Sequence, residues 1–263
     1  MSKLGASIGM AVMVTAAWSA SALAQDSLLP FGIGERLEYR VSVGKLGSVG
    51  SGTMSVDGPV DIRGTVTVVL RSEIQARVGL IKSTERATSW IDPARMTALR
   101  YQKRTRGMFS RGDEQVEMYP DEHRWENRGG RVGQSPTTAP LDELSFIYYV
   151  RTLPLDADSS EQLERHYDQA RNPIGVRVVG HDTVHTRAGT FATVIVEMRV
   201  KDPERYGGEG KIRLHLSDDA HRYPVRIESS VPVLGATVLT LEAITPAEKR
   251  LAHGAGKPVS GEP

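Results

Sequence analysis

The sequence contains no cysteine. This absence excludes disulfide bonds, thiolate catalysis, cysteine-ligated zinc and lipid attachment to a cysteine near the N-terminus. A chain without disulfides in an oxidising compartment must be stabilised by its hydrophobic core alone. About 220 structured residues are sufficient to build such a core.

Long apolar runs are also lacking, except at the start of the chain. Residues 1–24 have the pattern of a signal peptide: Lys3 supplies a positive charge, residues 4–20 are uncharged and apolar, and Ala22-Leu23-Ala24 is a small-residue cleavage site. We therefore expect cleavage after Ala24 and a periplasmic location. No later run approaches the ~20 apolar residues that span a bilayer, so no transmembrane segment is expected.

The chain has almost no net charge. It carries 33 Lys and Arg against 32 Asp and Glu, and loss of Lys3 with the signal peptide would bring the formal charge to zero. No overall field would attract nucleic acid or an anionic membrane, and nucleic acid is not an expected partner. The local exception is residues 100–111, with five cations and no acid. This segment is interpreted either as the solvated face of a strand and its turn or as a contact for an anionic ligand or lipid headgroup.

Apolar and polar residues alternate through most of the remaining chain. Residues 37–43, 65–74 and 194–200 are clear examples, and this period of two predicts half-buried antiparallel strands. About ten long strands cannot remain a flat open sheet. We therefore predict a mainly β domain over residues 25–244, with a strongly curved sheet or incomplete β-barrel. Residues 245–263 are rich in Pro, Gly, Ala and Lys and are expected to be disordered.

One segment departs from this alternation. Residues 140–155 begin with Pro140, carry Asp142 and Glu143 in the first turn, and are followed by Pro154, which is typical of a helix. The residues between are apolar on nearly every side, so the helix is predicted to be buried. Tyr, Phe and Ile also favour strands, and a continuous strand is the alternative.

Residues 214–228 gather acids and histidines. His215, Asp218, Asp219 and His221 could suggest a metal or acid–base site. Pairing Leu216 with Tyr223 and Leu214 with Val225, however, places the apolar residues of both strands on one side. The acids then lie in the connecting turn, which is their ordinary position. We interpret this segment as a hairpin.

A second histidine pair, His181 and His185, lies in a predicted strand. There the two residues would be about 13 Å apart, too far to share one metal ion. No metal site and no cofactor are therefore expected. The sequence also lacks a Gly-x-Ser-x-Gly elbow, a P-loop and a dinucleotide fingerprint. We accordingly expect a protein that is not an enzyme.

The aromatic residues are the remaining candidates for a binding site. Trp90, Tyr101, Phe146 and Tyr149 could line an apolar cavity inside the curved sheet, or they could be ordinary core residues. For each residue taken singly, ordinary core is the preferred interpretation. The cavity remains a hypothesis because a curved sheet over one helix often leaves its interior incompletely filled.

Several stretches, in this order and spacing, resemble an exported bacterial family known as domain of unknown function 3108. They are "PFGIGERLEYRVSVGKLGSVGSGTMSV", "LDELSFIYYVRTLPL", "RAGTFATVIVEMRV", "GKIRLHLSDDAHRYPVRIES" and "GATVLTLE". The final hairpin departs from the family, with His215 where a Trp is usual. The resemblance implies no catalytic residues. More distantly, the layout is similar to periplasmic lipoprotein carriers of the Lol type, which are incomplete barrels with a helical lid that bind acyl chains.

Two functional hypotheses follow. In the first, the protein binds a lipid, acyl chain or other apolar envelope ligand within the concave face of its sheet. In the second, it is an interaction or scaffold protein with an envelope protein as partner and no small-molecule ligand.

Overall fold

The computed structural model describes residues 27–107, 111–202, 208–231 and 235–253. The predicted signal peptide, residues 1–24, lies outside these residues. The described strands are β1 (Ser27–Ile33), β2 (Arg36–Val43), β3 (Gly47–Ile62), β4 (Thr65–Val78), β5 (Ile81–Asp92), β6 (Thr97–Gly107), β7 (Arg111–Tyr119), β8 (Arg124–Asn127), β9 (Val132–Gln134), β10 (Ser160–Leu163), β11 (Ile174–Thr186), β12 (Gly189–Asp202), β13 (Gly208–Ser217), β14 (Pro224–Val231), β15 (Gly235–Thr245) and β16 (Lys249–His253). The one α-helix among the described residues is α1 (Glu143–Val150), and short 3-10 turns occur at Gly44–Leu46, Pro120–Glu122 and Gln169–Arg171.

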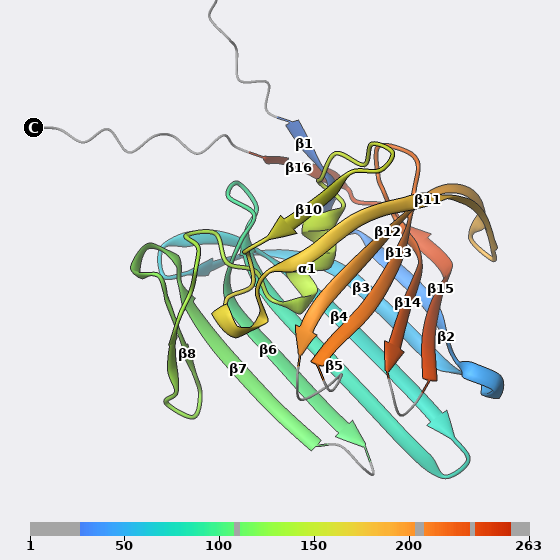
Figure 1. The fold of residues 1–263 in the computed structure, drawn as a ribbon, viewed down its shortest axis with the longest axis horizontal. Coiled ribbons are helices and arrows are strands. Elements are labelled where there is room, and N and C mark those ends of the chain that lie inside the picture. Colours follow the sequence, from blue (N-terminus) through green and yellow to red (C-terminus); the bar gives the residue numbers. More distant parts are fainter. Residues whose placement is uncertain (1–26, 108–110, 203–207, 232–234, 254–263) are drawn as a thin grey trace, which may run out of the picture.

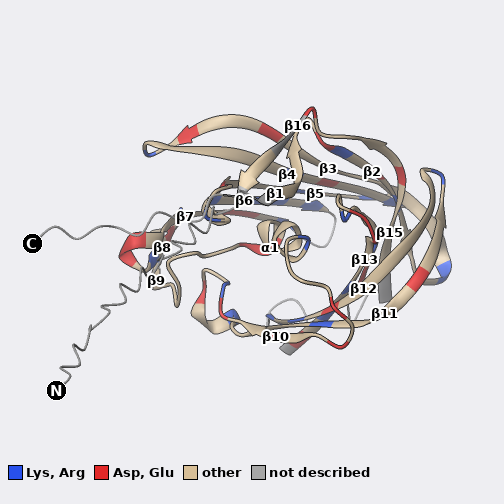
Figure 2. Ribbon diagram, turned by 90° about the horizontal axis from the view of Figure 1, so that it is seen from above, with Lys and Arg blue, Asp and Glu red and all other residues tan. Residues whose placement is uncertain are grey.

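Fourteen of the strands form one antiparallel sheet. Its order is β10-β11-β12-β13-β14-β15-β2-β3-β4-β5-β6-β7-β8-β9, so β10 and β9 are its edges and the sheet does not close into a barrel. The sheet curves around α1, which lies inside its concave side (Figure 2). The predicted curved sheet with one buried helix is therefore confirmed.

The centre of the sheet joins the two ends of the chain. β2 pairs with β15, from Arg36 opposite Thr245 to Val43 opposite Thr237. β1 and β16 pair with each other in a separate two-stranded sheet (Figure 1). Residues 245–263 are predicted to be disordered, whereas Lys249–His253 form β16. Leu251 packs against the core from this strand, which gives the segment an apolar anchor that its composition does not reveal.

Helix α1 begins at a well-defined cap. Asp142 accepts hydrogen bonds from the backbone N–H groups of Leu144 and Ser145, each at 2.9 Å, and its own N–H donates to Ser145 Oγ at 2.9 Å. This reciprocal arrangement is a capping box. Phe146, Tyr148 and other apolar residues of the helix are buried, as its all-round apolar character predicts.

The predicted register of the β13–β14 hairpin is wrong by one residue next to the turn and by two residues beyond it. Leu216 lies opposite Pro224, and Leu214 lies opposite Ile227 rather than Val225. Val225 is an extra residue in a β-bulge, and it is fully buried. A bulge lets both strands keep their apolar faces inward while the register shifts, so alternation alone could not detect it.

Candidate ligand-binding face

Side chains on the inner face of the sheet are fully buried next to α1 and partly exposed farther along the strands. On β4, Leu70 is fully buried and Ile74, four residues on and on the same face, is only half-buried. Ala87 on β5 is also half-buried, and both pack against the core. Ile212 on β13 and Val200 on β12 behave in the same way on the opposite wall. This set of four, which we call the apolar strip, is accessible from the concave side.

A group of charged side chains lies at the N-terminal end of α1. Glu143 accepts hydrogen bonds from the hydroxyl of Tyr101 and from Nη1 of Arg171. Lys103 Nζ lies 3.8 Å from Glu143 Oε2 and 3.8 Å from Glu85 Oε1. We call these five residues the Glu143 cluster. Lys103 and Tyr101 share the inward face of β6, which brings the cluster to the same concave side as the apolar strip.

The cluster favours the ionised form of Glu143. Burial alone would raise the pKa of this carboxyl, but nearby positive charge, chiefly Lys103 and Arg171, together with the hydrogen bond from Tyr101 lowers the pKa to about 2. The pKa of Tyr101 is raised by burial and by the nearby charge of Glu143, so its hydroxyl stays protonated and acts as a donor. The cluster thus offers ionised groups of both signs beside an apolar surface.

Two further titratable groups are buried behind the cluster. Asp142 also accepts a 2.5 Å hydrogen bond from Ser89 Oγ, and burial raises the pKa of this carboxyl to about 6. Burial lowers the pKa of His166 to about 4, and its Nε2 has no hydrogen-bond partner among the described residues. Both groups are therefore held towards their neutral forms.

These two groups oppose each other in the dependence of stability on pH. Folded Asp142 binds more protons than the unfolded chain between about pH 4 and 6, so its contribution falls as pH rises through that range. Folded His166 binds fewer protons between about pH 4 and 6.5, so its contribution rises with pH there. Their slopes should largely cancel in the natural protein.

The variant Asp142→Asn should expose the slope due to His166. Asn also caps helices, so α1 is expected to persist. The free energy of unfolding should then rise by about 3 kcal/mol between pH 4 and 6.5, more steeply than in the natural protein. Urea unfolding at a series of pH values measures this. Adding His166→Gln should flatten the slope again, and identical slopes in the natural protein and Asp142→Asn would contradict the assignment.

The four aromatic candidates occupy different environments. Tyr101 and Phe146 are buried on the inner side, Tyr101 in the Glu143 cluster and Phe146 in the core. Tyr149 is half-buried beneath the guanidinium of Arg165, 4.3 Å from its ring centroid. Trp90 is half-buried on the outer face of β5, where Arg100 lies 5.6 Å from its ring centroid. Tyr101 is the one of the four that reaches the charged cluster.

The sequence interpretation missed the charged members of the cluster. Lys103 belongs to the basic segment 100–111 by sequence, but it is in phase with Tyr101 on the inward face of its strand. A cation in the apolar phase of a strand was the available signal. Arg100 and Arg104 of that segment point the other way and pair with Glu117 at 2.5 Å and Asp113 at 3.2 Å.

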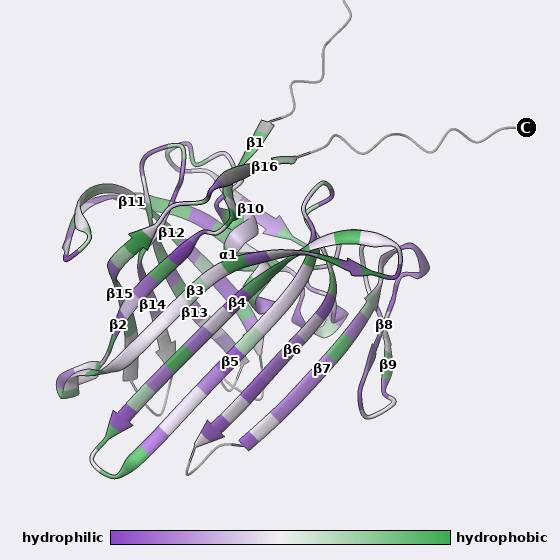
Figure 3. Ribbon diagram, turned by 180° about the vertical axis from the view of Figure 1, so that it is seen from behind, coloured by the Kyte–Doolittle hydropathy of each residue, from purple (hydrophilic) through white to green (hydrophobic). Residues whose placement is uncertain are grey.

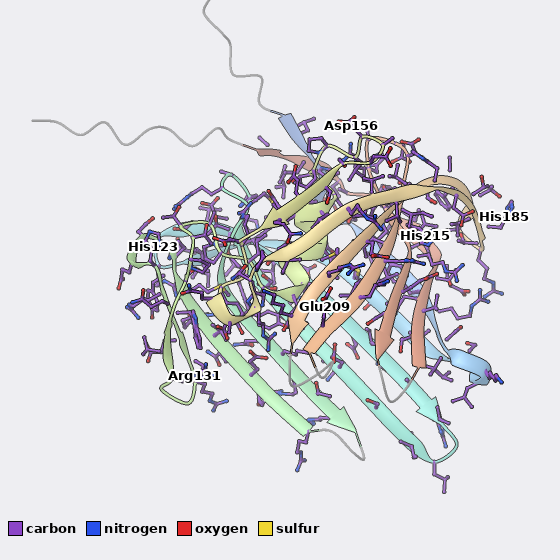
Figure 4. The ribbon with its side chains drawn as sticks, in the orientation of Figure 1. His123, Arg131, Asp156, His185, Glu209 and His215 are labelled. Atoms are coloured by element: carbon purple, nitrogen blue, oxygen red, sulfur yellow. The ribbon has the colours of Figure 1, made fainter. Side chains whose placement is uncertain are left out.

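The histidines and acids near residue 215 form a turn and its flanks. Asp219 Oδ1 accepts from Ser217 Oγ at 3.0 Å and from the backbone N–H of His221 at 2.8 Å. His215 Nδ1 lies 3.7 Å from Asp182 Oδ2, and the His221 ring stacks on Tyr223 instead. His185 lies on another strand, at the β11–β12 turn (Figure 4). No group of three or more potential metal ligands occurs among the described residues.

A small cleft lies beyond the C-terminal end of α1. Its lining is mainly apolar and includes Leu153, Leu155, Val176 and Val178. Its volume is about 10 Å³, which is room for about one water molecule and not for a lipid. Among the described residues, no helix is long and apolar enough to span a bilayer.

Comparison with known proteins identifies the relatives of this fold. The family described as "Protein of unknown function (DUF3108)" matches residues 38–242. The chain is similar to a β-barrel-like protein of domain of unknown function DUF1849 from Brucella abortus, with 8% identity, coverage of 84% of this chain and 100% of that chain, and a TM-score of 0.54. A protein with a YmcC-like fold from Bacteroides fragilis has 13% identity, coverage of 83% and 98%, and a TM-score of 0.30. Only the first score indicates a shared fold. No curated protein matches the chain.

Proposed function

This chain belongs to the DUF3108 family, and we propose that it is an exported, non-enzymatic protein that binds a lipid, acyl chain or other apolar envelope molecule on the concave face of its sheet. The apolar strip carries this proposal. Its four side chains are neither fully buried nor turned to the outside. A ligand that covers them would gain roughly 25 cal/mol for each Å² of apolar surface removed from water.

The Glu143 cluster supports an amphipathic ligand. Ionised groups of both signs and a protonated hydroxyl lie on the same concave side as the apolar strip. A polar headgroup could exchange hydrogen bonds with Lys103, Arg171 or Tyr101 while its chain covers Ile74 and Ala87. Ligand sites commonly combine a mainly apolar lining with a few such polar groups. The signal-peptide pattern of residues 1–24 supports a periplasmic source for the ligand.

The burial of the one nucleophile-and-base contact that lies on the inner side of the described residues supports a non-enzymatic role. Ser89 is hydrogen-bonded to the carboxylate of Asp142, which is the most suggestive nucleophile-and-base contact on the inner side. Both residues are 0% exposed. A substrate could not reach Ser89 Oγ without displacing α1, whose cap depends on the same carboxylate.

Replacement of Ile74 tests this function. Ile74→Gln keeps the approximate volume but makes the strip polar, so affinity for a fluorescent fatty acid should fall about tenfold or more. Val66→Gln is the matched control, since Val66 is 66% exposed at the other end of the same strand. Native mass spectrometry of protein purified from the periplasm should also detect a bound lipid. Absence of both lipid and fatty-acid binding would refute the proposal.

The alternative is an envelope scaffold without a small-molecule ligand. The filled interior around α1 and the one-water cleft favour it, because neither offers space for a lipid. Chemical crosslinking in cells distinguishes this scaffold role from lipid binding. A scaffold should be crosslinked to one defined envelope protein, and the purified chain should carry no lipid.

A further inference from the structure

One end of the sheet carries exposed apolar residues at its turns. Leu80 is 89% exposed and Val78 is 41% exposed in the β4–β5 hairpin, and Leu46 is 61% exposed in the β2–β3 turn. Figure 3 shows the hydrophobic tip of the β4–β5 hairpin, and Figure 1 shows both turns at the same end of the sheet. Single exposed leucines are ordinary, but their collection at neighbouring turns is not.

The β4–β5 turn presents Leu80 to the outside. Val78 pairs with Ile81, so the turn has only two residues, Gly79 and Leu80. Gly79 has φ of +60°, a left-handed conformation that two-residue hairpin turns require and glycine readily adopts. Polar residues are the usual companions of glycine in such turns. Leu80 gains nothing from the core in this position.

The same turns carry cations without acids. Lys45 lies beside Leu46, and the strand ends contribute Arg77, Lys82, Arg106 and Arg111. None of the five forms an ion pair within the described residues, although most other arginines of the sheet do. The basic segment 100–111 therefore divides into paired residues along the strand and unpaired residues at its end.

The register places these cations directly opposite one another. Arg77 lies opposite Lys82 at the end of the β4–β5 hairpin, and Arg106 lies opposite Arg111 at the end of the β6–β7 hairpin. Like charges in directly opposite positions destabilise a sheet. The two hairpins are neighbours, because Thr84 of β5 pairs with Arg106 of β6. Two adjacent unfavourable pairs concentrate positive charge around the exposed leucine.

We propose that this end of the sheet, defined by Leu46, Val78, Leu80 and the five cations, docks on the anionic surface of a lipid bilayer. Anionic headgroups would relieve the repulsion in both cation pairs, and each cation near such a surface strengthens binding about fivefold. Leu80 would enter the boundary between headgroups and acyl chains. An acidic protein surface would account for the cations but not for the exposed apolar residues at the turns. An anionic bilayer accounts for both. This proposal stands whether or not the concave face holds a ligand.

Vesicle flotation of the protein purified from the periplasm tests the proposal. The protein should float with phosphatidylcholine vesicles that contain phosphatidylglycerol, and much less with phosphatidylcholine alone. Added salt should weaken this binding, since it screens exposed charges. Equal flotation with both kinds of vesicle, or with neither, would overturn the proposal.

Substitutions at the tips locate the contact. Leu80→Gln should weaken vesicle binding about tenfold. The double substitution Arg77→Gln with Lys82→Gln should weaken it about 25-fold, from about fivefold for each cation. Val66→Gln and Arg95→Gln, at the turns of the opposite end, are the matched controls and should change nothing. Circular dichroism confirms folding of each variant. Binding that survives both tip variants, or that is replaced by capture of an envelope protein through the same residues, would exclude the bilayer as the partner.

Discussion

Replacing Arg151 with alanine should lower the free energy of unfolding by about 3–5 kcal/mol, which is a large part of the stability of an ordinary domain. The side chain of Arg151 is 0% exposed and that of Glu35 is 1% exposed. Nη1 and Nη2 of Arg151 donate to the two carboxylate oxygens of Glu35 at 2.7 and 2.9 Å. Without the guanidinium, an ionised carboxylate would be left buried and unpaired.

The same guanidinium connects three parts of the chain. Nη2 also donates to the carbonyl of Pro30 on β1 at 3.0 Å and to that of His221 in the β13–β14 turn at 2.9 Å. Phe31 and Tyr148 lie against it, with ring centroids 5.3 and 5.2 Å away. Arg151 itself follows α1 directly. Its loss should therefore loosen the end of the helix, β1 and the turn together.

Urea unfolding measures the effect, and a double variant is its control. Arg151→Met combined with Glu35→Leu replaces both charges with apolar groups and should be more stable than Arg151→Ala, since buried ion pairs often exchange for apolar pairs without loss. If Arg151→Ala lowers the free energy of unfolding by less than about 1 kcal/mol, the ion pair behaves like an exposed one. That result would show that the guanidinium is hydrated.

Phe146→Ala is expected to cost about 3–5 kcal/mol through the cavity that it creates in the core. Phe146 is 1% exposed on α1, and its ring meets that of Tyr149 edge-on with centroids 6.0 Å apart. The apolar groups that surround it belong to one continuous cluster with the sheet. Thermal or urea unfolding measures the cost. Ile147→Ala, at a half-buried position of the same helix, should cost less.

This second prediction also decides what α1 does. A helix that fills the interior loses core packing when Phe146 is truncated, and the whole domain becomes less stable. A helix that opens as a lid would separate from the sheet at little cost, and its truncation would scarcely change global unfolding. Local hydrogen exchange in residues 143–150 would then be fast while the sheet stayed protected. We expect slow exchange in the helix.

The features that were predicted correctly rest on local patterns. Alternation around Leu37–Val43 and Val194–Val200 depends only on which side of a strand faces the core. The helix at residues 143–150 was predicted from the acids of its first turn and the prolines that flank it. Each pattern lies within a short window, where propensity and burial agree.

The features that were missed depend on distant partners. Val225 became a bulge because β13 and β14 both keep their apolar faces inward at a shifted register. Leu251 belongs to a strand only because β1 lies beside it. By sequence, Glu143 is an ordinary helix-start acid, and its pairing with Lys103 and Arg171 arises when β6 and the turn at Gln169–Arg171 meet the helix. Among these contacts, the Glu143 cluster alone leaves a local signal, which is the cation Lys103 in the apolar phase of its strand.

The pairing of β2 with β15 sets the order in which the molecule can be completed during synthesis. Arg36 is synthesised early, but its partner on β15, Thr245, follows more than two hundred residues later. Until then the backbone of β2 lacks its hydrogen-bonding partner on that edge. β1 likewise waits for β16. Pairings between such remote segments are slow to form because loop closure precedes their gain in energy. The chain therefore keeps unpaired strand edges until its last strands are available, and it needs chaperone protection throughout synthesis.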